Sequence, residues 1–465
     1  MMTMAELARA LPQAALQGDG RVRFARVSTD SRTTEAGALF VALRGERFDG
    51  HDHVEQAVAR GAVALLVERP LPLAVPQLVV ADSRRALGQA ASAWRGRFDL
   101  PLIAVAGSNG KTTVTQMIAA ILAQAHGEKR RLATRGNLNN DIGLPLMLFE
   151  LGAQHRAAVL EVGMNHPGEI AWLAKLARPT VAVVNNAQRE HQEFMAGVEA
   201  TAVENGAVIE ALPADGVAVF PASDACVAVW RRQAGTRRVL DFALDGEATL
   251  TADVQYDAEG SRLSIASPAG LIDVRLGVAG VHNAHNALAA TAAALAVGVA
   301  PADIAAGLSA FAPVAGRGVR HRLVADALLI DDTYNANPDS VRAAIDLLAT
   351  LPAPRTLALG DMGEVGADGP AYHREVGAWA AERGIDRLLC LGTATRDSAA
   401  AFGARARHFD TVEALIEAAR EAAAAGGTLL VKGSRFMRME RVVGALRADT
   451  ADSVAAGAHA GEGIH

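Results

Sequence analysis

One segment of the chain constrains its fold more than any other. Residues 102–124, LIAVAGSNGKTTVTQMIAAILAQ, read as a buried strand, a glycine-rich turn and a helix. Such a turn points backbone N–H groups and the amino terminus of the helix at an anion. Strands this apolar are typical of parallel sheets covered on both faces by helices, so the segment predicts an open α/β fold. The expected phosphate-binding residues are Gly107, Ser108, Asn109, Gly110, Lys111, Thr112 and Thr113.

Two side chains of this loop have expected roles. Lys111 is predicted to reach the β- and γ-phosphates of a nucleotide, and the hydroxyl of Thr112 to bind Mg²⁺. The usual pattern places a glycine six positions before the lysine, whereas this chain has Val105 there, so the loop is a shortened variant. Four of the 45 basic residues are lysines. This scarcity and the strand–loop–helix context favour phosphate binding over the alternative, a chance Gly-Lys-Thr sequence in a connecting turn.

Length, charge and cysteine content limit the other possibilities. A chain of 465 residues exceeds a single hydrophobic core, so several domains are expected. The net charge of −6 argues against nucleic-acid binding, because no excess of positive charge neutralises phosphates. The two cysteines form no metal or disulfide pattern, which favours the cytoplasm. Without a signal sequence or an apolar run long enough to span a membrane, no membrane insertion is expected.

Changes in pattern divide the chain into three expected domains. Residues 1–98 mix short strands and helices, residues 99–314 alternate apolar strands with helices, and residues 315–465 do so again. The last two domains therefore read as open parallel sheets, the final one Rossmann-like. Residues 214–280 are expected to form a β-rich insert in the middle domain, and the tail from about residue 450 to residue 465 is expected to be disordered.

Two further candidates follow neighbouring strands of the middle domain. Glu161 lies near the carboxyl end of the strand in AAVLEVGMNHPGEI, where open α/β sheets bind ligands, and a Mg²⁺ ligand explains it best. His191 lies past the end of the next strand and is predicted to be a second metal ligand or a proton-handling group. From position alone, a solvated loop histidine is an equal alternative.

Several motifs in order resemble the Mur ligase family, the ATP-dependent amide ligases that build the peptide stem of bacterial peptidoglycan. They are GSNGKTT, LEVGMN, VHNAHNALAA and GRGVRH. STDSR, followed by GALFVALRGERFDGHDH, resembles the uridine-diphosphate site of the family. TRGNLNNDIGLPLMLFE, DTYNANPDS and LGDMGEVG are most similar to the member that joins D-alanyl-D-alanine to UDP-N-acetylmuramoyl-tripeptide. The resemblance covers nearly the whole chain and implies successive domains for the UDP-sugar, for ATP and for the dipeptide.

The resemblance also implies a reaction and a set of site residues. A monomer would use ATP and Mg²⁺ to form an amide bond between these two small molecules through an acyl phosphate, releasing ADP and phosphate. The implied catalytic residues are Lys111, Glu161, His191 and Arg317, with Thr112, Glu161 and His191 as metal ligands. Beyond the loop, the implied ATP contacts are His282, Asn283, Asp332 and Asn337. The implied contacts of the UDP-linked substrate are Ser31, Arg32, Asn137, Asn139 and Asn140.

The chain departs from the resemblance at one position. The family usually carries a carbamylated lysine that gives oxygens to a second Mg²⁺. Here no lysine exists between Lys175 and Lys432, and the aligned residue is Asn205. Because hard cations need oxygen ligands, Glu204 or a water held by Asn205 is expected to take the place of the carbamate.

Three alternative functions stay open. One is a family ligase that adds the third stem residue, although its DNPR signature is missing and the YNANPDS element weighs against it. Another is a polyglutamate-adding ligase that acts on folate, against which the uridine-site motifs weigh. The last is a nucleotide-gated regulatory protein, which would need neither the first domain nor a second sheet after residue 315.

Overall fold

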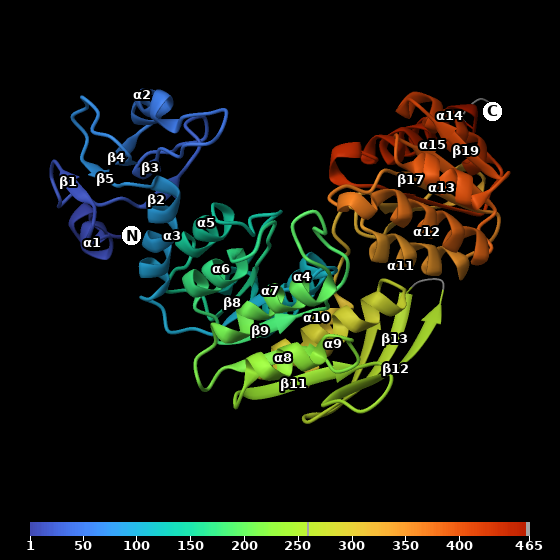
Figure 1. Ribbon diagram of the computed structural model, residues 1–465, viewed down its shortest axis with the longest axis horizontal. Helices are drawn as coiled ribbons and strands as arrows, with labels where there is room; N and C mark the ends of the chain where they lie inside the picture. The colour runs from blue at the N-terminus through green and yellow to red at the C-terminus, as the bar shows by residue number, and fades with distance from the viewer. Residues whose placement is uncertain (258–259, 462–465) are drawn as a thin grey trace.

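The structure, a computed structural model, describes residues 1–257 and 260–461. In this part of the chain, the strands form sheets of five, nine and six strands, each the centre of one domain. Figure 1 shows the first domain (blue) at one end of an elongated molecule, the third (orange to red) at the other and the middle domain between them. The predicted α/β class with three domains is confirmed. No helix in the described residues has the length and apolar content needed to cross a membrane.

The first domain is a small α/β unit. Its elements are α1 (Met4–Ala10), β1 (Ala15–Gln17), β2 (Arg26–Ser28), β3 (Ala38–Val41), α2 (Val54–Ala59), β4 (Ala62–Val67), β5 (Gln77–Val79) and α3 (Ser83–Arg95). The strand order is β1-β5-β4-β3-β2, with β1 antiparallel to β5 and the other pairs parallel. The side chain of Asp82 caps α3 by accepting from the N–H of Arg85, which fixes where this helix begins.

The middle domain contains the phosphate loop. Its elements are β6 (Leu102–Ala106), α4 (Lys111–His126), β7 (Arg131–Ala133), α5 (Gly143–Phe149), β8 (Ala157–Glu161), α6 (Glu169–Ala177), β9 (Val181–Val184), α7 (Val198–Glu210), β10 (Val217–Pro221), α8 (Val227–Ala234), β11 (Arg238–Ala243), β12 (Leu250–Asp257), β13 (Gly260–Ser267), β14 (Gly270–Leu276), α9 (Val281–Ala296) and α10 (Pro301–Ser309). The strand order is β14-β13-β12-β11-β10-β9-β6-β8-β7.

The β-rich segment of the middle domain is no separate unit. Strands β10, β11 and β12 run parallel to β9 within the central sheet, and β13 and β14 extend that sheet as antiparallel neighbours. The expected insert at residues 214–280 therefore continues the sheet. Turn signals between short strands show where strands end, but they do not show which sheet the strands join.

The central strands are buried on both faces, which is why their sequences are almost continuously apolar. Ile103 and Val105 of β6 pack into a core with α4, α9 and α10, while Leu102 and Ala104 pack into the core on the opposite face with α5, α6 and α7. Because β8 and β9 lie on either side of β6, the loops that follow these strands meet at one edge of the sheet.

The third domain is a second open sheet. Its elements are β15 (Val319–Arg322), β16 (Leu328–Asp332), α11 (Pro338–Ala349), β17 (Arg355–Gly360), α12 (Gly369–Glu382), β18 (Arg387–Leu391), α13 (Thr395–Phe402), β19 (Ala406–Phe409), α14 (Val412–Ala424), β20 (Thr428–Lys432) and α15 (Glu440–Gly461). The strand order is β15-β16-β20-β17-β18-β19, and β15 is antiparallel to β16.

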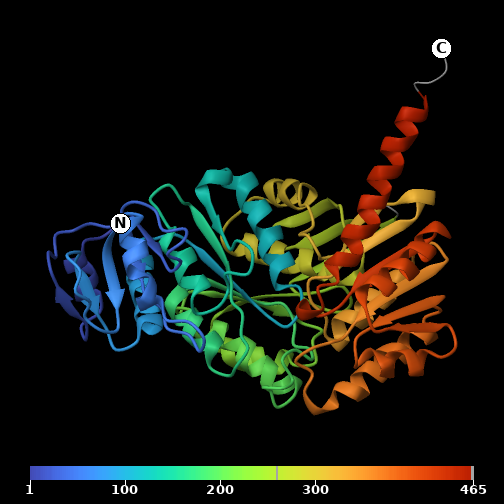
Figure 2. The same ribbon diagram turned by 90° about the horizontal axis from the view of Figure 1, so that it is seen from above.

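The last helix extends into the tail. Helix α15 continues to Gly461, and Figure 2 shows it extending away from the body of the third domain. Residues 450–461, TADSVAAGAHAG, are rich in alanine, the strongest helix former, which favours a helix without packing. The expected disorder of the tail stays a prediction. Residues 462–465 of the expected tail lie outside the described residues.

Candidate active site

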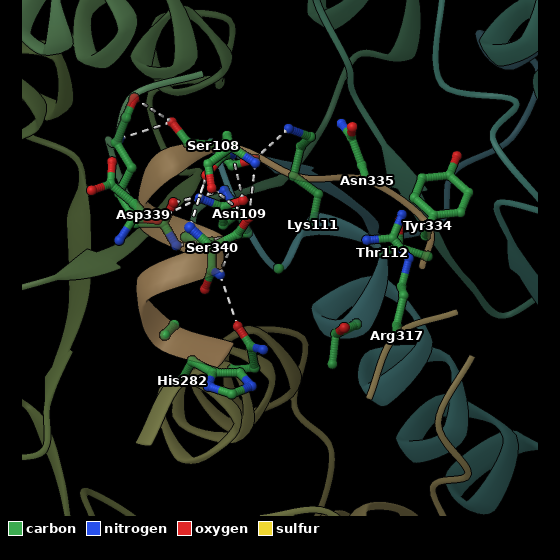
Figure 3. Close-up of a pocket in the computed structure, with 18 of the residues that line it drawn as sticks. Ser108, Asn109, Lys111, Thr112, His282, Arg317, Tyr334, Asn335, Asp339 and Ser340 are labelled. Carbon is green, nitrogen blue, oxygen red and sulfur yellow. Dashed lines mark hydrogen bonds between the residues drawn. The ribbon is translucent and has the colours of Figure 1, made fainter. Parts of the chain in front are cut away.

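A cavity of about 640 Å³ lies between the middle and third domains, at the carboxyl edge of β6, β8 and β9. Figure 3 shows side chains of the phosphate loop beside Asp339 and Ser340 of the third domain. The cavity is lined by many residues predicted from the sequence: Ser108, Asn109, Gly110, Lys111, Thr112, Thr113, Asn137, Asn139, Asn140, Glu161, His191, His282, Asn283, Arg317, Asp332 and Asn337.

Two glycines give the phosphate loop its shape. Gly107 and Gly110 have φ values of 129° and 81°, in the region that favours glycine. A Cβ on Gly110 would lie 2.5 Å from the side chains of Asn185 and Asn286, so a larger residue does not fit. Gly110 also precedes α4, and no side chain in the described residues caps this helix. Its first N–H groups are therefore available to bind an anion in the cavity.

Asparagine side chains from other segments of the middle domain hold the backbone of the loop. The N–H of Gly107 donates to Oδ1 of Asn205 (3.0 Å), and the N–H of Asn109 donates to Oδ1 of Asn186 (2.8 Å). Nδ2 of Asn185 donates to the carbonyl oxygen of Asn109 (2.8 Å). These bonds fix the backbone of the loop before any ligand binds, so little ordering of the loop is left for the ligand to impose.

Lys111 points back across its own loop. Its Nζ donates to the carbonyl oxygens of Gly107 (2.6 Å) and Ser108 (2.9 Å) and to Oε1 of Glu190 (2.5 Å). The other oxygen of Glu190, Oε2, is buried and has no hydrogen-bond partner among the described residues. Glu190 lines the cavity but was not predicted from the sequence. The available signal was its position directly before His191.

Thr112 and Glu161 form a buried pair beneath the loop. The hydroxyl of Thr112 donates to Oε2 of Glu161 (2.7 Å), and Nδ2 of Asn139 donates to Oε1 (2.6 Å). The pairing of β6 with β8 sets Val105 opposite Glu161, which places this carboxylate next to the start of the loop. Glu161 is 3% exposed. Hydroxyl and carboxylate oxygens are ligands that Mg²⁺ accepts, and here they lie within reach of phosphates bound by the loop.

His191 lies between two carboxylates. Its φ is 49°, a left-handed conformation that is uncommon for a residue with a side chain. Nδ1 lies 2.6 Å from Oε2 of Glu364, and Nε2 lies 3.5 Å from Oε1 of Glu190. Burial disfavours the charged ring, but the two carboxylates outweigh burial and raise the pKa of His191 to about 9. Glu364, which was left out of the predicted site, therefore joins it from the third domain.

The opposite wall of the cavity combines α9 with the third domain. His282 and Asn283 lie in the first turn of α9. Nδ2 of Asn283 donates to the carbonyl oxygen of Ala279 (2.8 Å), so this side chain does not cap the helix. Asn337 caps α11, and its Nδ2 donates to Oδ1 of Asn109 (2.9 Å). Asn337 thus connects the third domain directly to the phosphate loop.

Charged side chains from the third domain complete this wall. Asp332, at the end of β16, accepts a hydrogen bond of 2.6 Å from Lys432, at the end of β20. The guanidinium carbon of Arg317 lies 4.0 Å from the ring centroid of Tyr334, as Figure 3 shows. Nε of Arg317 is buried without a hydrogen-bond partner among the described residues. A guanidinium with an unused donor at the cavity can bind an anionic group.

The residues predicted for the UDP-linked substrate fall into two separate groups. Ser31 and Arg32 lie in the first domain, outside this cavity. Ser31 donates from its hydroxyl to Gln56 (2.7 Å), and Arg32 is exposed and paired with Asp30 (2.7 Å). The second group lines the cavity near Glu161: Asn137, Asn139 and Asn140.

The expected substitutes for the family lysine have other roles. The carboxylate of Glu204 accepts from the N–H groups of Gly168 (2.9 Å) and Ile170 (2.9 Å) at the start of α6. The role of Glu204 as a metal ligand stays a prediction, and the start of α6 already uses one lone pair on each of its oxygens. Asn205 uses Oδ1 to hold Gly107. Neither residue is among those that line the cavity.

The residues at the cavity fit Mg²⁺ bound together with a nucleotide. In residues 1–257 and 260–461, no three His, Cys, Asp or Glu side chains are grouped as ligands of one metal ion. Mg²⁺ in nucleotide enzymes keeps several waters and takes one or two carboxylates plus substrate phosphates, so few protein ligands are needed. The Thr112–Glu161 pair and the unpartnered oxygen of Glu190 are donors of this kind.

A phosphate loop on a parallel sheet, with a further α/β domain against its cavity, defines an ATP-dependent enzyme of the P-loop class. Comparison with known proteins gives the family. Residues 23–95 match the Mur ligase family catalytic domain, residues 105–294 the Mur ligase middle domain and residues 316–435 the Mur ligase glutamate ligase domain. The chain belongs to the Mur ligase family, and it is an ATP-dependent ligase that uses Mg²⁺.

The similarity extends over nearly the whole chain. The chain is 42% identical to UDP-N-acetylmuramoyl-tripeptide–D-alanyl-D-alanine ligase of Escherichia coli strain K12, over 90% of this chain and 93% of that relative. A crystal structure of MurF from Acinetobacter baumannii has a TM-score of 0.89 at 35% identity, covering 96% of this chain and 98% of that one. MurF ligase from Thermotoga maritima in complex with ADP has a TM-score of 0.82 at 26% identity, covering 93% of this chain and 99% of that one.

Proposed function

We propose that this enzyme joins D-alanyl-D-alanine to UDP-N-acetylmuramoyl-tripeptide, converting ATP to ADP and phosphate, in peptidoglycan precursor synthesis. One observation carries the proposal. The phosphate loop, the Thr112–Glu161 pair and Arg317 of the third domain all face one cavity, where a substrate carboxylate can meet the γ-phosphate. The similarity to the Escherichia coli ligase over 90% of this chain supports the choice of substrates.

The triphosphate would lie along the loop from Gly107 to Thr113. The first N–H groups of α4 and the ammonium of Lys111 offset its charge. Thr112 and Glu161 would hold one Mg²⁺, and His191 would contact a second once its imidazolium ring loses a proton. Mg²⁺ supplies positive charge that offsets the phosphate oxygens during transfer. The base and ribose would lie against the opposite wall of the cavity, formed by His282, Asn283, Asp332 and Asn337.

The reaction has two bond-forming steps. A carboxylate oxygen of the tripeptide attacks the γ-phosphorus, the bond to the bridging oxygen breaks, and ADP leaves. The amine nitrogen of D-alanyl-D-alanine then attacks the carbonyl carbon of the acyl phosphate, phosphate leaves, and the nitrogen loses a proton. Lys111 and Arg317 would offset the charge on the transferred phosphoryl group, because both cations face the cavity.

Each domain has a proposed substrate. Residues 1–98 would bind uridine diphosphate through Ser31 and Arg32, residues 99–314 would bind ATP, and residues 315–465 would bind the dipeptide. Asn137, Asn139 and Asn140 would hold the peptide end of the acceptor close to the γ-phosphate, because they line the same cavity as Lys111. The enzyme would act as a monomer in the cytoplasm, with these small molecules as its partners.

Mass spectrometry of the product tests the proposal. Wild-type enzyme with ATP, Mg²⁺, UDP-N-acetylmuramoyl-tripeptide and D-alanyl-D-alanine should give the pentapeptide product, whereas free lysine or diaminopimelate in place of the dipeptide should give none. Lys111→Ala should slow ligation by about 10²-fold or more. Lys175→Ala is the matched control, because Lys175 is exposed on α6 and lies outside the cavity. Full-rate ligation by Lys111→Ala, or phosphate release without any amine, would refute the proposal.

A further inference from the structure

Glu190 is the anionic partner of Lys111 in this structure. Its Oε1 lies 2.5 Å from Nζ of Lys111, and the side chain of Glu190 is 12% exposed. The other contacts of Nζ are carbonyl oxygens of the loop, at Gly107 and Ser108. The carboxylate of Glu190 thus neutralises the charge that the proposed function assigns to the phosphates of ATP. A bound triphosphate would compete with Glu190 for Lys111.

The backbone around Glu190 is held on both sides. Arg189 donates to Asp339 (2.6 Å) and to Glu375 (2.6 Å) of the third domain. His191 lies 2.6 Å from Glu364 of the same domain. With both neighbours anchored while the domains are closed, the backbone of Glu190 stays beside the cavity when Lys111 moves to the phosphates. Its carboxylate would then stay at the cavity with neither oxygen paired to Lys111.

A buried carboxylate that loses its closest cation is less favourable, and His191, 3.5 Å from Oε1, already pairs with Glu364 at 2.6 Å, so a further positive charge is favoured at Glu190. The divalent ion that accompanies ATP brings such a charge into the cavity. Each oxygen of Glu161 accepts one hydrogen bond, from Thr112 or Asn139, and keeps a lone pair for the Mg²⁺ that the proposed function places there. In Glu190, by contrast, Oε2 has no hydrogen-bond partner in the described part of the chain, and Oε1 becomes available once Lys111 leaves.

We propose that Glu190 exchanges Lys111 for Mg²⁺ when the nucleotide binds, and that it is an oxygen ligand of the ion next to the γ-phosphate. Mg²⁺ commonly binds one or two carboxylates together with substrate phosphates, so the exchange needs no further protein ligand. This inference rests on the proposed function, because it requires that ATP binds at the phosphate loop.

Binding of a non-hydrolysable ATP analogue, measured by calorimetry with EDTA and then with Mg²⁺, tests the exchange. With EDTA, Glu190→Gln should bind the analogue at least as tightly as wild type. In this variant Lys111 does not have to break an ion pair with residue 190 before it binds the phosphates. With Mg²⁺, the gain in affinity should be smaller in Glu190→Gln than in wild type, by about tenfold or more. Glu193→Gln is the matched control, because Glu193 is exposed in the same loop and outside the cavity. It should behave as wild type.

Electron paramagnetic resonance of Mn²⁺ with the same analogue gives a second readout. Glu190→Gln should bind Mn²⁺ more weakly than wild type, and Glu190→Asp, which keeps the charge, should recover part of the loss. Unfolding temperatures without ligand show whether each variant folds, and Glu190→Asp carries the test if the glutamine variant does not.

Equal Mg²⁺-dependent gains in wild type and the folded Glu190 variants would overturn the inference. Equal gains combined with tighter binding by Glu190→Gln under both conditions would make Glu190 a competitor for Lys111 and no metal ligand. If wild-type enzyme fails to bind the analogue at all, the proposed function fails first, and this inference fails with it.

Discussion

The molecule has two junctions between domains, and they use different contacts. At the first junction, α3 of the first domain packs against α5 and α6 of the middle domain, and one apolar core extends across both domains. A Cβ on Gly88 of α3 would lie 2.8 Å from Leu176 and 3.3 Å from Trp172. Arg95, which is 5% exposed, closes this junction by donating to backbone carbonyl oxygens.

The second junction, between the middle and third domains, is made of polar side chains. Within the described residues, the two apolar cores of the third domain contain no residue of the middle domain. The contacts across the junction are ion pairs and hydrogen bonds: Arg189 with Asp339 and Glu375, His191 with Glu364, and Asn109 with Asn337.

The difference shows which junction can open. Separating an apolar interface costs about 25 cal/mol for each Å² exposed to water. When a polar interface separates, each group bonds to water in place of its protein partner, so the net cost is about 0.5–1.5 kcal/mol for each hydrogen bond. We therefore expect the first junction to stay closed and the second to open and close. The cavity lies at the second junction, so ATP can enter and ADP can leave without breaking an apolar core.

Removing the guanidinium of Arg95 should have the largest effect, because it breaks the first junction. Arg95→Met keeps the apolar stem but leaves the carbonyl oxygens of Ala177 (3.2 Å) and Leu100 (3.1 Å) buried without a donor. Urea denaturation should show a loss of about 3 kcal/mol or more in the free energy of unfolding. Arg97→Met is the control, since Arg97 is 40% exposed and should cost less than about 1 kcal/mol. Equal losses of unfolding free energy in the two variants would show that Arg95 does not hold the first junction more strongly than an exposed arginine does.

Overpacking the same junction should have the next largest effect. Gly88→Leu forces side-chain atoms into the space occupied by Leu176 and Trp172. The cost should be about 1–3 kcal/mol, visible in calorimetry as a lower unfolding temperature for the first and middle domains together. Gly444→Leu places the same side chain on α15, where nothing lies within 4 Å of the glycine. If both variants unfold at the same temperature, close packing does not hold the first junction.

Breaking the polar junction should leave stability nearly intact and change the domain arrangement. Arg189→Met removes the ion pairs with Asp339 and Glu375 across the junction. Small-angle scattering should show a larger radius of gyration, and KM for ATP should rise roughly three- to tenfold, as for the loss of about 1 kcal/mol. Arg342→Met removes the other partner of Glu375 but lies within the third domain, so it serves as the control. An unchanged radius in Arg189→Met would mean that other contacts close the junction.

The same comparison explains what could be predicted from the sequence. The apolar strands and the phosphate loop produce local patterns, so the fold class and the cavity position of Lys111 and Glu161 followed from the residues. The contacts of the second junction join residues far apart in the chain, and no local pattern signals them. Glu364 meets His191 across two domains, and Asn337 meets Asn109 in the same way.

Local patterns also misled where one residue type has several uses. Glu204 lies directly before Asn205, the position aligned with the family lysine, and no sequence pattern signals that its oxygens accept from the start of α6. Glu190 was missed because a glutamate before a histidine in a loop is unremarkable until Lys111 is seen beside it. Tyr334 supports Arg317 through its ring, a contact within the third domain between the segment before β15 and the segment after β16.

Acid should open the second junction and leave the first unchanged, which is the smallest expected effect. The hydrogen bond from Arg189 is the main cause that lowers the pKa of Glu375, and the bond from His191 likewise lowers the pKa of Glu364. A carboxyl group with a lowered pKa contributes fully above its ordinary pKa of about 4.3 and loses its contribution as pH falls through the lowered value.

The radius of gyration should therefore stay constant from about pH 7 to about pH 5 and rise below about pH 4. In Arg189→Met the rise of the radius should be shallower. The bond between Arg189 and Glu375 is already missing in this variant, so protonation of Glu375 cannot break it. The backbone carbonyl groups that accept from Arg95 do not titrate, so the first junction should not open as the pH falls. A junction that opens as the pH is raised from 5 to 7 would show that these carboxylates do not hold it closed.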